Sequence, residues 1–271
     1  PTLSVKTRLM SHEGDLTQWV SAENPLTIQH GAHGLVGLGQ AIRLVFRGPS
    51  RFRDAAETWR SIVAAATIDD AIKAPGSGLV CFGTFTFSDD SPQESVLIVP
   101  QVVIGRHGTT SWRTNISLPD QHLQREHSPS SHPASFAPLE WKPGLLGESD
   151  YVGEVAKLVA RLQEGEANKV VLARDLIAHA PGIRDWRAAL QRLVESYPDC
   201  ATFAIDGLVG STPETLARVE GGRLSIRVLA GSAARGDNPA DDRQQAQNLV
   251  TSSKDNDEHR FAVGSVVNSL H

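Results

Sequence analysis

Residues 95–105, SVLIVPQVVIG, contain the most apolar stretch of the chain, and 95–104 are predicted to form a strand. With Pro100 and Gln101 in its middle, this stretch is far too short to cross a membrane. The turn-rich residues 88–93, SDDSPQ, separate it from another predicted strand at 79–87. Further toward the N-terminus, apolar residues at helical spacing predict a helix over 52–66.

The composition is that of an ordinary globular protein. The chain has 271 residues, 40% of them hydrophobic, and 26 basic against 31 acidic side chains give a net charge of −5. This mild acidity argues against nucleic-acid binding, which needs a basic face. The two cysteines, Cys81 and Cys200, offer neither a disulfide framework nor a paired zinc motif. We therefore expect a cytoplasmic protein with no signal peptide and no membrane or nucleic-acid partner.

A polar segment divides the chain in two. Residues 120–138, DQHLQREHSPSSHPASFAP, are rich in Ser and Pro and are predicted to be a surface loop or linker. It separates an N-terminal part, 1–119, from a C-terminal part, 139–271. In the C-terminal part the patterns predict a helix from about Ser149, a strand over 169–174 (KVVLAR), a helix around 186–197, a hairpin turning at Gly221-Gly222, and helix from 239 to the end.

Two motifs that suggest a cofactor or metal have simpler explanations. Residues 31–39, GAHGLVGLG, look like a dinucleotide-binding loop. Their spacing is not GxGxxG and no strand–helix–strand unit surrounds them, so a tight hairpin is favoured. His122, His127 and His132 are spaced by five residues, which fits no common metal-ligand pattern.

Four segments of the C-terminal part carry unusual polar groups at predicted strand ends or helix starts. They are KVVLAR at 169–174, GSTPE at 210–214, LAGSAARG at 229–236 and SKDNDEH at 253–259. In this order they resemble the chorismate-utilising enzymes, and the front segments 43–59 and 76–87 look like isochorismate synthases of the actinobacterial type. Taken singly, each of these polar residues is more typical of a solvated surface than of a functional site. The resemblance implies an α+β fold with large antiparallel sheets flanked by helices.

The resemblance also implies a role for individual residues. Lys169 would activate water, whereas anthranilate synthases, which use ammonia, typically carry Gln at this position. Glu214 would protonate the departing C4 hydroxyl, and Glu258 would hold a Mg²⁺ ion that binds the ring carboxylate. These roles suit the chemistry, since water attack on a ring carbon needs a base and loss of a hydroxyl needs a proton donor.

The third motif separates branches of the family. Aminodeoxychorismate synthases of the common bacterial type place a nucleophilic Lys before the glycine of this motif, and here that residue is Ala230. Ala230, Gly231 and Ser232 would line the substrate site, with the Gly231 backbone amide cradling a carboxylate. Both Lys169 and Ala230 favour water as the nucleophile.

The implied activity is that of an isomerase, isochorismate synthase. It would convert chorismate to isochorismate with Mg²⁺, by water attack at C2 and loss of the C4 hydroxyl, and feed menaquinone or siderophore biosynthesis. A salicylate synthase and a non-catalytic chorismate-binding fragment stay open as alternatives. The family's catalytic region normally continues further, so we expect this chain to be C-terminally incomplete and the apolar face of its last helix to be uncovered. The complete protein is expected to be a monomer.

Overall fold

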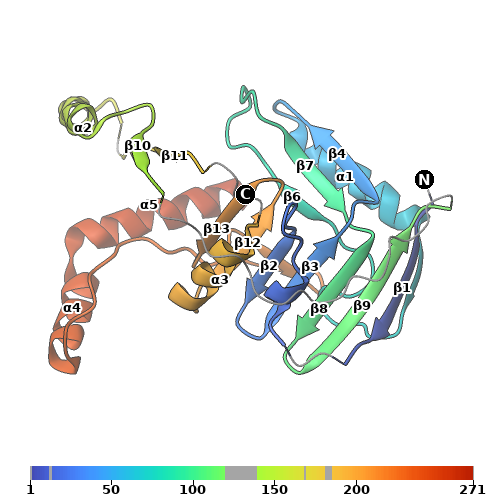
Figure 1. The fold of residues 1–271 in the computed structure, drawn as a ribbon. Helices are drawn as coiled ribbons and strands as arrows, with labels where there is room; N and C mark the ends of the chain where they lie inside the picture. Colours follow the sequence, from blue (N-terminus) through green and yellow to red (C-terminus); the bar gives the residue numbers. More distant parts are fainter. Residues whose placement is uncertain (1, 12–13, 120–138, 168, 181–184, 271) are drawn as a thin grey trace.

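The computed structural model describes residues 2–11, 14–119, 139–167, 169–180 and 185–270. The predicted linker at 120–138, with His122, His127 and His132, lies outside the described residues. Figure 1 shows a body of packed sheets, from which the helices at 148–163, 239–251 and 253–270 project.

The body is built on an eight-stranded sheet with the order β13-β12-β2-β3-β8-β9-β1-β5. Neighbouring strands are antiparallel except β1 and β5, which are parallel. The strands are β1 (Ser4–Leu9), β2 (Thr27–His30), β3 (His33–Leu38), β5 (Thr67–Asp70), β8 (Val102–His107), β9 (Thr110–Ser117), β12 (Ala201–Ile205) and β13 (Leu208–Thr212). The sheet thus takes strands from both sides of residues 120–138.

A smaller sheet with the order β4-β7-β6 shares two stretches of chain with the large one. It consists of β4 (Ile42–Phe46), β6 (Phe82–Thr84) and β7 (Ser95–Val99). Along the chain, β3 is followed by β4, and β7 is followed by β8. Across the sheets, β3 pairs with β8 in the large sheet, and β4 pairs with β7 in the small one. The two stretches therefore form one antiparallel ribbon, which bends at residues 39–41 and 100–101 and belongs to both sheets.

The prediction of a single strand over 95–104 is wrong, because the apolar run is divided between β7 and β8. Pro100 has no backbone N–H for a sheet ladder, so the strand is interrupted there. Gln101 makes the bend a junction: its N–H donates to the Leu38 carbonyl at 3.1 Å, and its carbonyl accepts from the Ile116 N–H at 2.7 Å. Strand pairing resumes at Val102 in the other sheet.

The core lies between these sheets and helix α1 (Arg51–Ala65), which confirms the helix predicted over 52–66. Val99 and Val103, on either side of the bend, are fully buried, and Ile62 from α1 packs into the same cluster. A second cluster forms under η1 (Leu16–Trp19) and α3 (Arg187–Ser196), where Leu16 and Leu190 are fully buried. Burial of each such side chain contributes about 1.5–3 kcal/mol to stability.

The predicted hairpins are present. Strands β2 and β3 turn through Gly31, which has a φ of 56°, so the glycine run is a hairpin as predicted. Strands β14 (Arg218–Glu220) and β15 (Arg223–Ser225) pair across Gly221-Gly222. The structure thus places one predicted turn at Gly31 and the other at Gly221-Gly222.

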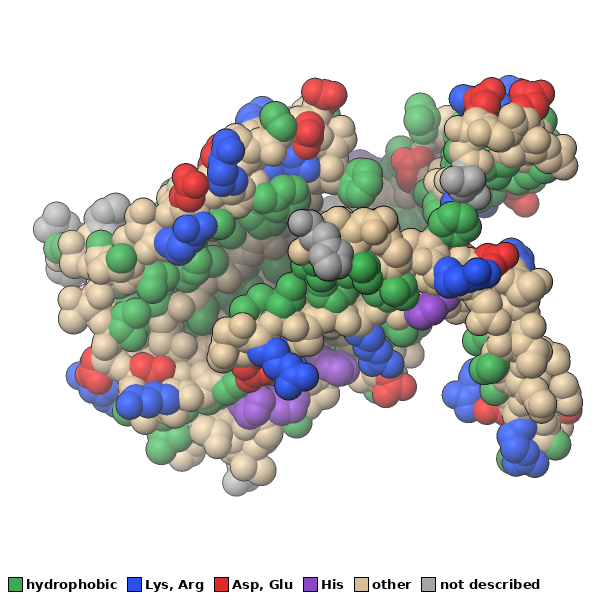
Figure 2. All heavy atoms as spheres, turned by 180° about the vertical axis from the view of Figure 1, so that it is seen from behind, with side chains coloured by type: hydrophobic (Ala, Val, Ile, Leu, Met, Phe, Trp, Pro, Cys, Tyr) green, Lys and Arg blue, Asp and Glu red, His purple; other side chains and the backbone are tan. Residues whose placement is uncertain are grey.

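The remaining elements form an arm that stands out from the sheets (Figures 1 and 2). It contains β10 (Trp141–Pro143) paired with β11 (Leu176–Ala178), and the helices α2 (Glu148–Gln163), α4 (Pro239–Thr251) and α5 (Ser253–Leu270). None of these three helices has a buried residue. The apolar side chains Phe261, Val267 and Leu270 of α5 are exposed, at 50%, 45% and 59%.

Two sequence predictions for this arm need correction. Residues 169–174 form no strand, because pairing with β10 begins only at Leu176; Val171 is 80% exposed. The C-terminal helix is also interrupted, at Ser252, whose ψ of 118° is extended. No described helix is both long enough and apolar enough to span a membrane.

Gly105 tests how tightly the large sheet is packed. A Cβ at this position would lie 2.2 Å from Cε2 of Trp112, which is fully buried on the neighbouring strand. We expect Gly105→Ala to lower the free energy of unfolding by about 1–3 kcal/mol through overpacking. Chemical denaturation measures the change.

Gly153→Ala is the matched control, since a Cβ there meets nothing within 4 Å and Gly153 lies within α2. It should be neutral or stabilise by up to about 1 kcal/mol. Equal destabilisation by both variants would contradict the packing argument.

Candidate active site

Two of the predicted site residues form an ion pair. Lys169 Nζ lies 3.0 Å from Glu258 Oε1, and both side chains are about one third exposed, at 35% and 34%. Lys169 comes from the segment between α2 and β11, and Glu258 from the second turn of α5. At this exposure the ion pair contributes only about 0–1 kcal/mol to stability. Its significance is that it places two predicted site residues, from distant parts of the sequence, next to each other.

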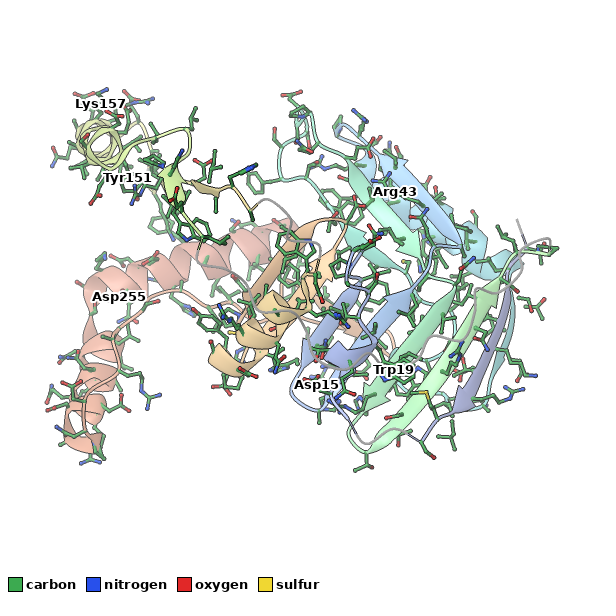
Figure 3. The ribbon with its side chains drawn as sticks, in the orientation of Figure 1. Asp15, Trp19, Arg43, Tyr151, Lys157 and Asp255 are labelled. Atoms are coloured by element: carbon green, nitrogen blue, oxygen red, sulfur yellow. The ribbon has the colours of Figure 1, made fainter. Side chains whose placement is uncertain are left out.

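The segment that carries Lys169 is held by contacts that the sequence did not reveal. The Tyr151 hydroxyl of α2 donates to the Leu172 carbonyl at 3.1 Å (Figure 3). Downstream, Asp175 Oδ1 accepts from the Leu145 N–H at 2.9 Å. No spacing or motif points to Tyr151 or Asp175, because each contacts a backbone group.

The glycine motif packs against the start of α5. Gly231 has a φ of 85°, a left-handed conformation that side chains disfavour, and a Cβ on it would lie 3.1 Å from Cβ of Asp255. Asp255 lies at the junction of α4 and α5 (Figure 3), one turn before Glu258. Residues of three of the four motifs therefore meet around the first turns of α5.

Arg235 and Gly236, at the end of the glycine motif, fix the start of α4. Arg235 makes two hydrogen bonds of 2.6 Å to the Asp242 carboxylate, and the Gly236 N–H donates to the same carboxylate at 3.1 Å. Asn238 caps the helix by accepting from the Ala240 and Asp241 N–H groups. Arg235, and to a smaller extent the Gly236 N–H, lower the pKa of the Asp242 carboxyl below its ordinary value.

Glu214 is not part of this group. It is exposed on the connection between β13 and β14, where its backbone N–H donates to Thr212 Oγ1 at 3.2 Å. Ala230 is half-buried and Ser232 is exposed beside Gly231. The structure thus brings Lys169, Glu258 and the glycine motif into one region, and none of the described contacts joins Glu214 to them.

No cluster of metal ligands among the described residues coincides with this region, and neither does the cavity near η1. Among the described residues, no three His, Cys, Asp or Glu groups come close enough to hold an ion together. A cavity of about 790 Å³ lies between η1 and α3, lined in part by Trp19, Trp186 and Arg187, and no predicted site residue lines it. The motifs and their contacts identify the candidate site, and this cavity does not.

Comparison with known proteins identifies the family. The family model described as "Chorismate binding enzyme" matches residues 26–271, nearly the whole chain. The chain belongs to the chorismate-binding enzyme family.

Curated relatives within this family are named isochorismate synthases. The isochorismate synthase EntC of Escherichia coli is 36% identical over 203 residues, which cover 73% of this chain and 48% of EntC. The salicylate biosynthesis isochorismate synthase of Pseudomonas aeruginosa is 25% identical over 260 residues, covering 86% of this chain and 53% of the relative. The chain thus spans about half the length of the curated relatives it matches.

Solved structures confirm the α+β fold expected from the sequence. The menaquinone-specific isochorismate synthase MenF of Escherichia coli aligns with a TM-score of 0.69 and 19% identity, covering all of this chain and 64% of MenF. DhbC of Bacillus anthracis aligns with a TM-score of 0.67 and 22% identity, covering 94% of this chain and 61% of DhbC. At these identities the likeness concerns the fold alone.

The lowered pKa of Asp242 gives a pH dependence at the base of α4. Because this pKa is lower in the folded protein, the stabilisation is present above the ordinary aspartate pKa and is lost as the pH falls through the lowered value. We expect the Gly236 amide resonance, followed by NMR, to titrate below the ordinary aspartate range.

In Arg235→Gln the midpoint of the Gly236 titration should move up toward the ordinary aspartate range, because the variant removes the main cause of the lowered pKa of Asp242. Arg260→Gln, which removes a different exposed arginine paired with Asp257, should leave it unchanged. An unchanged titration midpoint in Arg235→Gln would show that Arg235 does not lower the pKa of Asp242.

Proposed function

We propose that this chain provides the water-activating part of an isochorismate synthase, which converts chorismate to isochorismate. The observation that carries the proposal is the ion pair between Lys169 and Glu258, with Gly231 packed one turn away against Asp255. Family membership and the names of the relatives support the same reaction.

In the proposed reaction, Lys169 Nζ is the base. It takes a proton from water as the water oxygen bonds to C2 of the ring, the ring double bond shifts, and the C4–O bond breaks. In the role that the resemblance implies, Glu214 protonates the departing C4 hydroxyl, which leaves as water, so one water enters and one leaves. No described contact joins Glu214 to Lys169, so this proton donor must reach the ring from the connection between β13 and β14. An ammonium group cannot accept a proton, so Lys169 must leave its ion pair with Glu258 and become neutral before it acts.

The residues present fit a divalent cation at Glu258. The carboxylate oxygen Oε1 of Glu258 already pairs with a positive group in this structure, the Lys169 ammonium. About two thirds of the Glu258 side chain is shielded from solvent. Mg²⁺ prefers hard oxygen ligands and often takes only one or two carboxylates from the protein, with waters and substrate as the rest. When bound, it would supply positive charge for a substrate carboxylate. Glu258 would hold it, and Lys169 would lose its partner.

Lys169→Ala tests the base. In the complete natural protein we expect turnover to fall by about 10²–10⁴-fold, the usual cost of losing general-base catalysis, while chorismate binding persists. Chromatography of the products gives the rate, and calorimetry gives the binding. Near wild-type turnover would remove Lys169 from the mechanism.

The two glutamates should separate by their response to metal. Glu258→Gln should weaken Mg²⁺ binding, because it removes a carboxylate ligand, and raise the Mg²⁺ concentration needed for activity. Glu214→Gln should abolish turnover and leave Mg²⁺ affinity nearly intact, since it removes only the proton donor. Equal effects of both variants on Mg²⁺ affinity would contradict this division of roles.

The same product analysis decides between the proposal and its alternatives. Isochorismate without pyruvate supports an isochorismate synthase. Release of pyruvate would indicate a salicylate synthase, and chorismate binding without any product would indicate a non-catalytic protein.

A further inference from the structure

Two histidines face each other on neighbouring strands of the large sheet. His33 opens β3 and His107 ends β8, and the two residues are directly paired in the antiparallel register. Their Nδ1 atoms lie 3.0 Å apart, and their rings are tilted by 52° with centroids 4.3 Å apart. Both side chains are exposed, and neither has a role in the function proposed above.

We propose that His33 and His107 form a two-nitrogen binding site for a divalent transition metal ion such as Cu²⁺, Ni²⁺ or Zn²⁺. Imidazole nitrogen is a preferred ligand for these ions, whereas Mg²⁺ requires oxygen. The proposal concerns a different place and a different class of ion from the Glu258 site, so neither depends on the other.

The separation of the two nitrogens suits a shared ion. With metal–nitrogen bonds of about 2.0–2.1 Å and a ligand–metal–ligand angle of about 90–109°, two ligating nitrogens are roughly 2.9–3.4 Å apart. The observed 3.0 Å lies in this range. At this separation both Nδ1 atoms can reach one ion.

The sheet holds this geometry in advance. Directly opposed side chains on antiparallel strands have Cβ atoms about 4.5–5.5 Å apart, and here the pairing of β3 and β8 runs without interruption from His33–His107 to Leu38–Val102. The Gly108 N–H also donates to the Ala32 carbonyl at 3.1 Å just beyond the pair. Little conformational entropy is lost on binding when the donors are already placed.

The site takes two donors from the described protein, and water would complete the coordination. His30 is the cross-strand partner of His33 on β2 and lies on the same face of the sheet. Even so, no group of three potential ligands close enough to share an ion occurs among the described residues. We therefore assign the metal to His33 and His107 only.

Titration of the protein with Cu²⁺, Ni²⁺ and Zn²⁺ tests the proposal, at a pH where imidazole is neutral. Calorimetry should show one site, with Cu²⁺ bound most tightly, and electron paramagnetic resonance of the Cu²⁺ form should show two nitrogen donors. His33→Gln and His107→Gln should each lower the affinity at least about tenfold, because each leaves a single imidazole.

His30→Gln and His179→Gln are matched controls, each removing an exposed histidine outside the pair, and both should bind like the wild type. Metal should also raise the melting temperature of the wild type and both controls, but not of the two site variants. Mg²⁺ should have no effect that depends on His33 or His107.

Several outcomes would overturn the proposal. One is equal affinity in the wild type and the His107→Gln variant. Another is loss of binding in His30→Gln, which would show a different donor set. A third is no binding at all, which would leave the pair as a hydrogen bond between two rings. Circular dichroism of each variant confirms that it is folded.

Discussion

The fold depends on the bend at Pro100 and Gln101. An apolar run that could have formed one strand is divided there between two sheets, and its partner, β3 continuing into β4, bends with it. The bend is stable because the Gln101 backbone is hydrogen bonded on both sides, to Leu38 and Ile116. Bends at which strands change sheets allow two sheets to enclose one core, and Val99 and Val103 are buried in that core here.

The body and the arm differ in how they are stabilised. In the body, buried apolar side chains fix the strands, and α3 continues this packing up to β12 and β13. In the arm, helices α2, α4 and α5 bury no residue, and local polar contacts such as Arg235 with Asp242 and Tyr151 with Leu172 set the geometry. Lys169 and Glu258, two of the residues expected to act at the site, lie in this less tightly packed part. Low packing density suits a site whose charged groups must exchange partners.

The sequence predicted most of what local patterns determine. The helix over 52–66, the glycine hairpins and the family itself follow from spacing, turn residues and ordered motifs. Prediction from the sequence failed where a pairing partner distant in the chain determines whether a segment forms a strand. Residues 169–174 have the composition of a strand but no strand beside them, and the run at 95–104 is divided because its two halves pair with different neighbours. For the site, motif order indicated Lys169 and Glu258, but their direct pairing depends on how α5 lies against the segment between α2 and β11, which no spacing reveals.

The central claim is that water activated at Lys169 supplies a ring hydroxyl. The most direct measurement is to incubate the complete protein with chorismate and Mg²⁺ in water labelled with oxygen-18 and to analyse the product by mass spectrometry. The account predicts one labelled oxygen, located at C2 of isochorismate, since that hydroxyl comes from solvent. An isochorismate product without label would contradict water as the nucleophile, as would an amino product formed when ammonium is present.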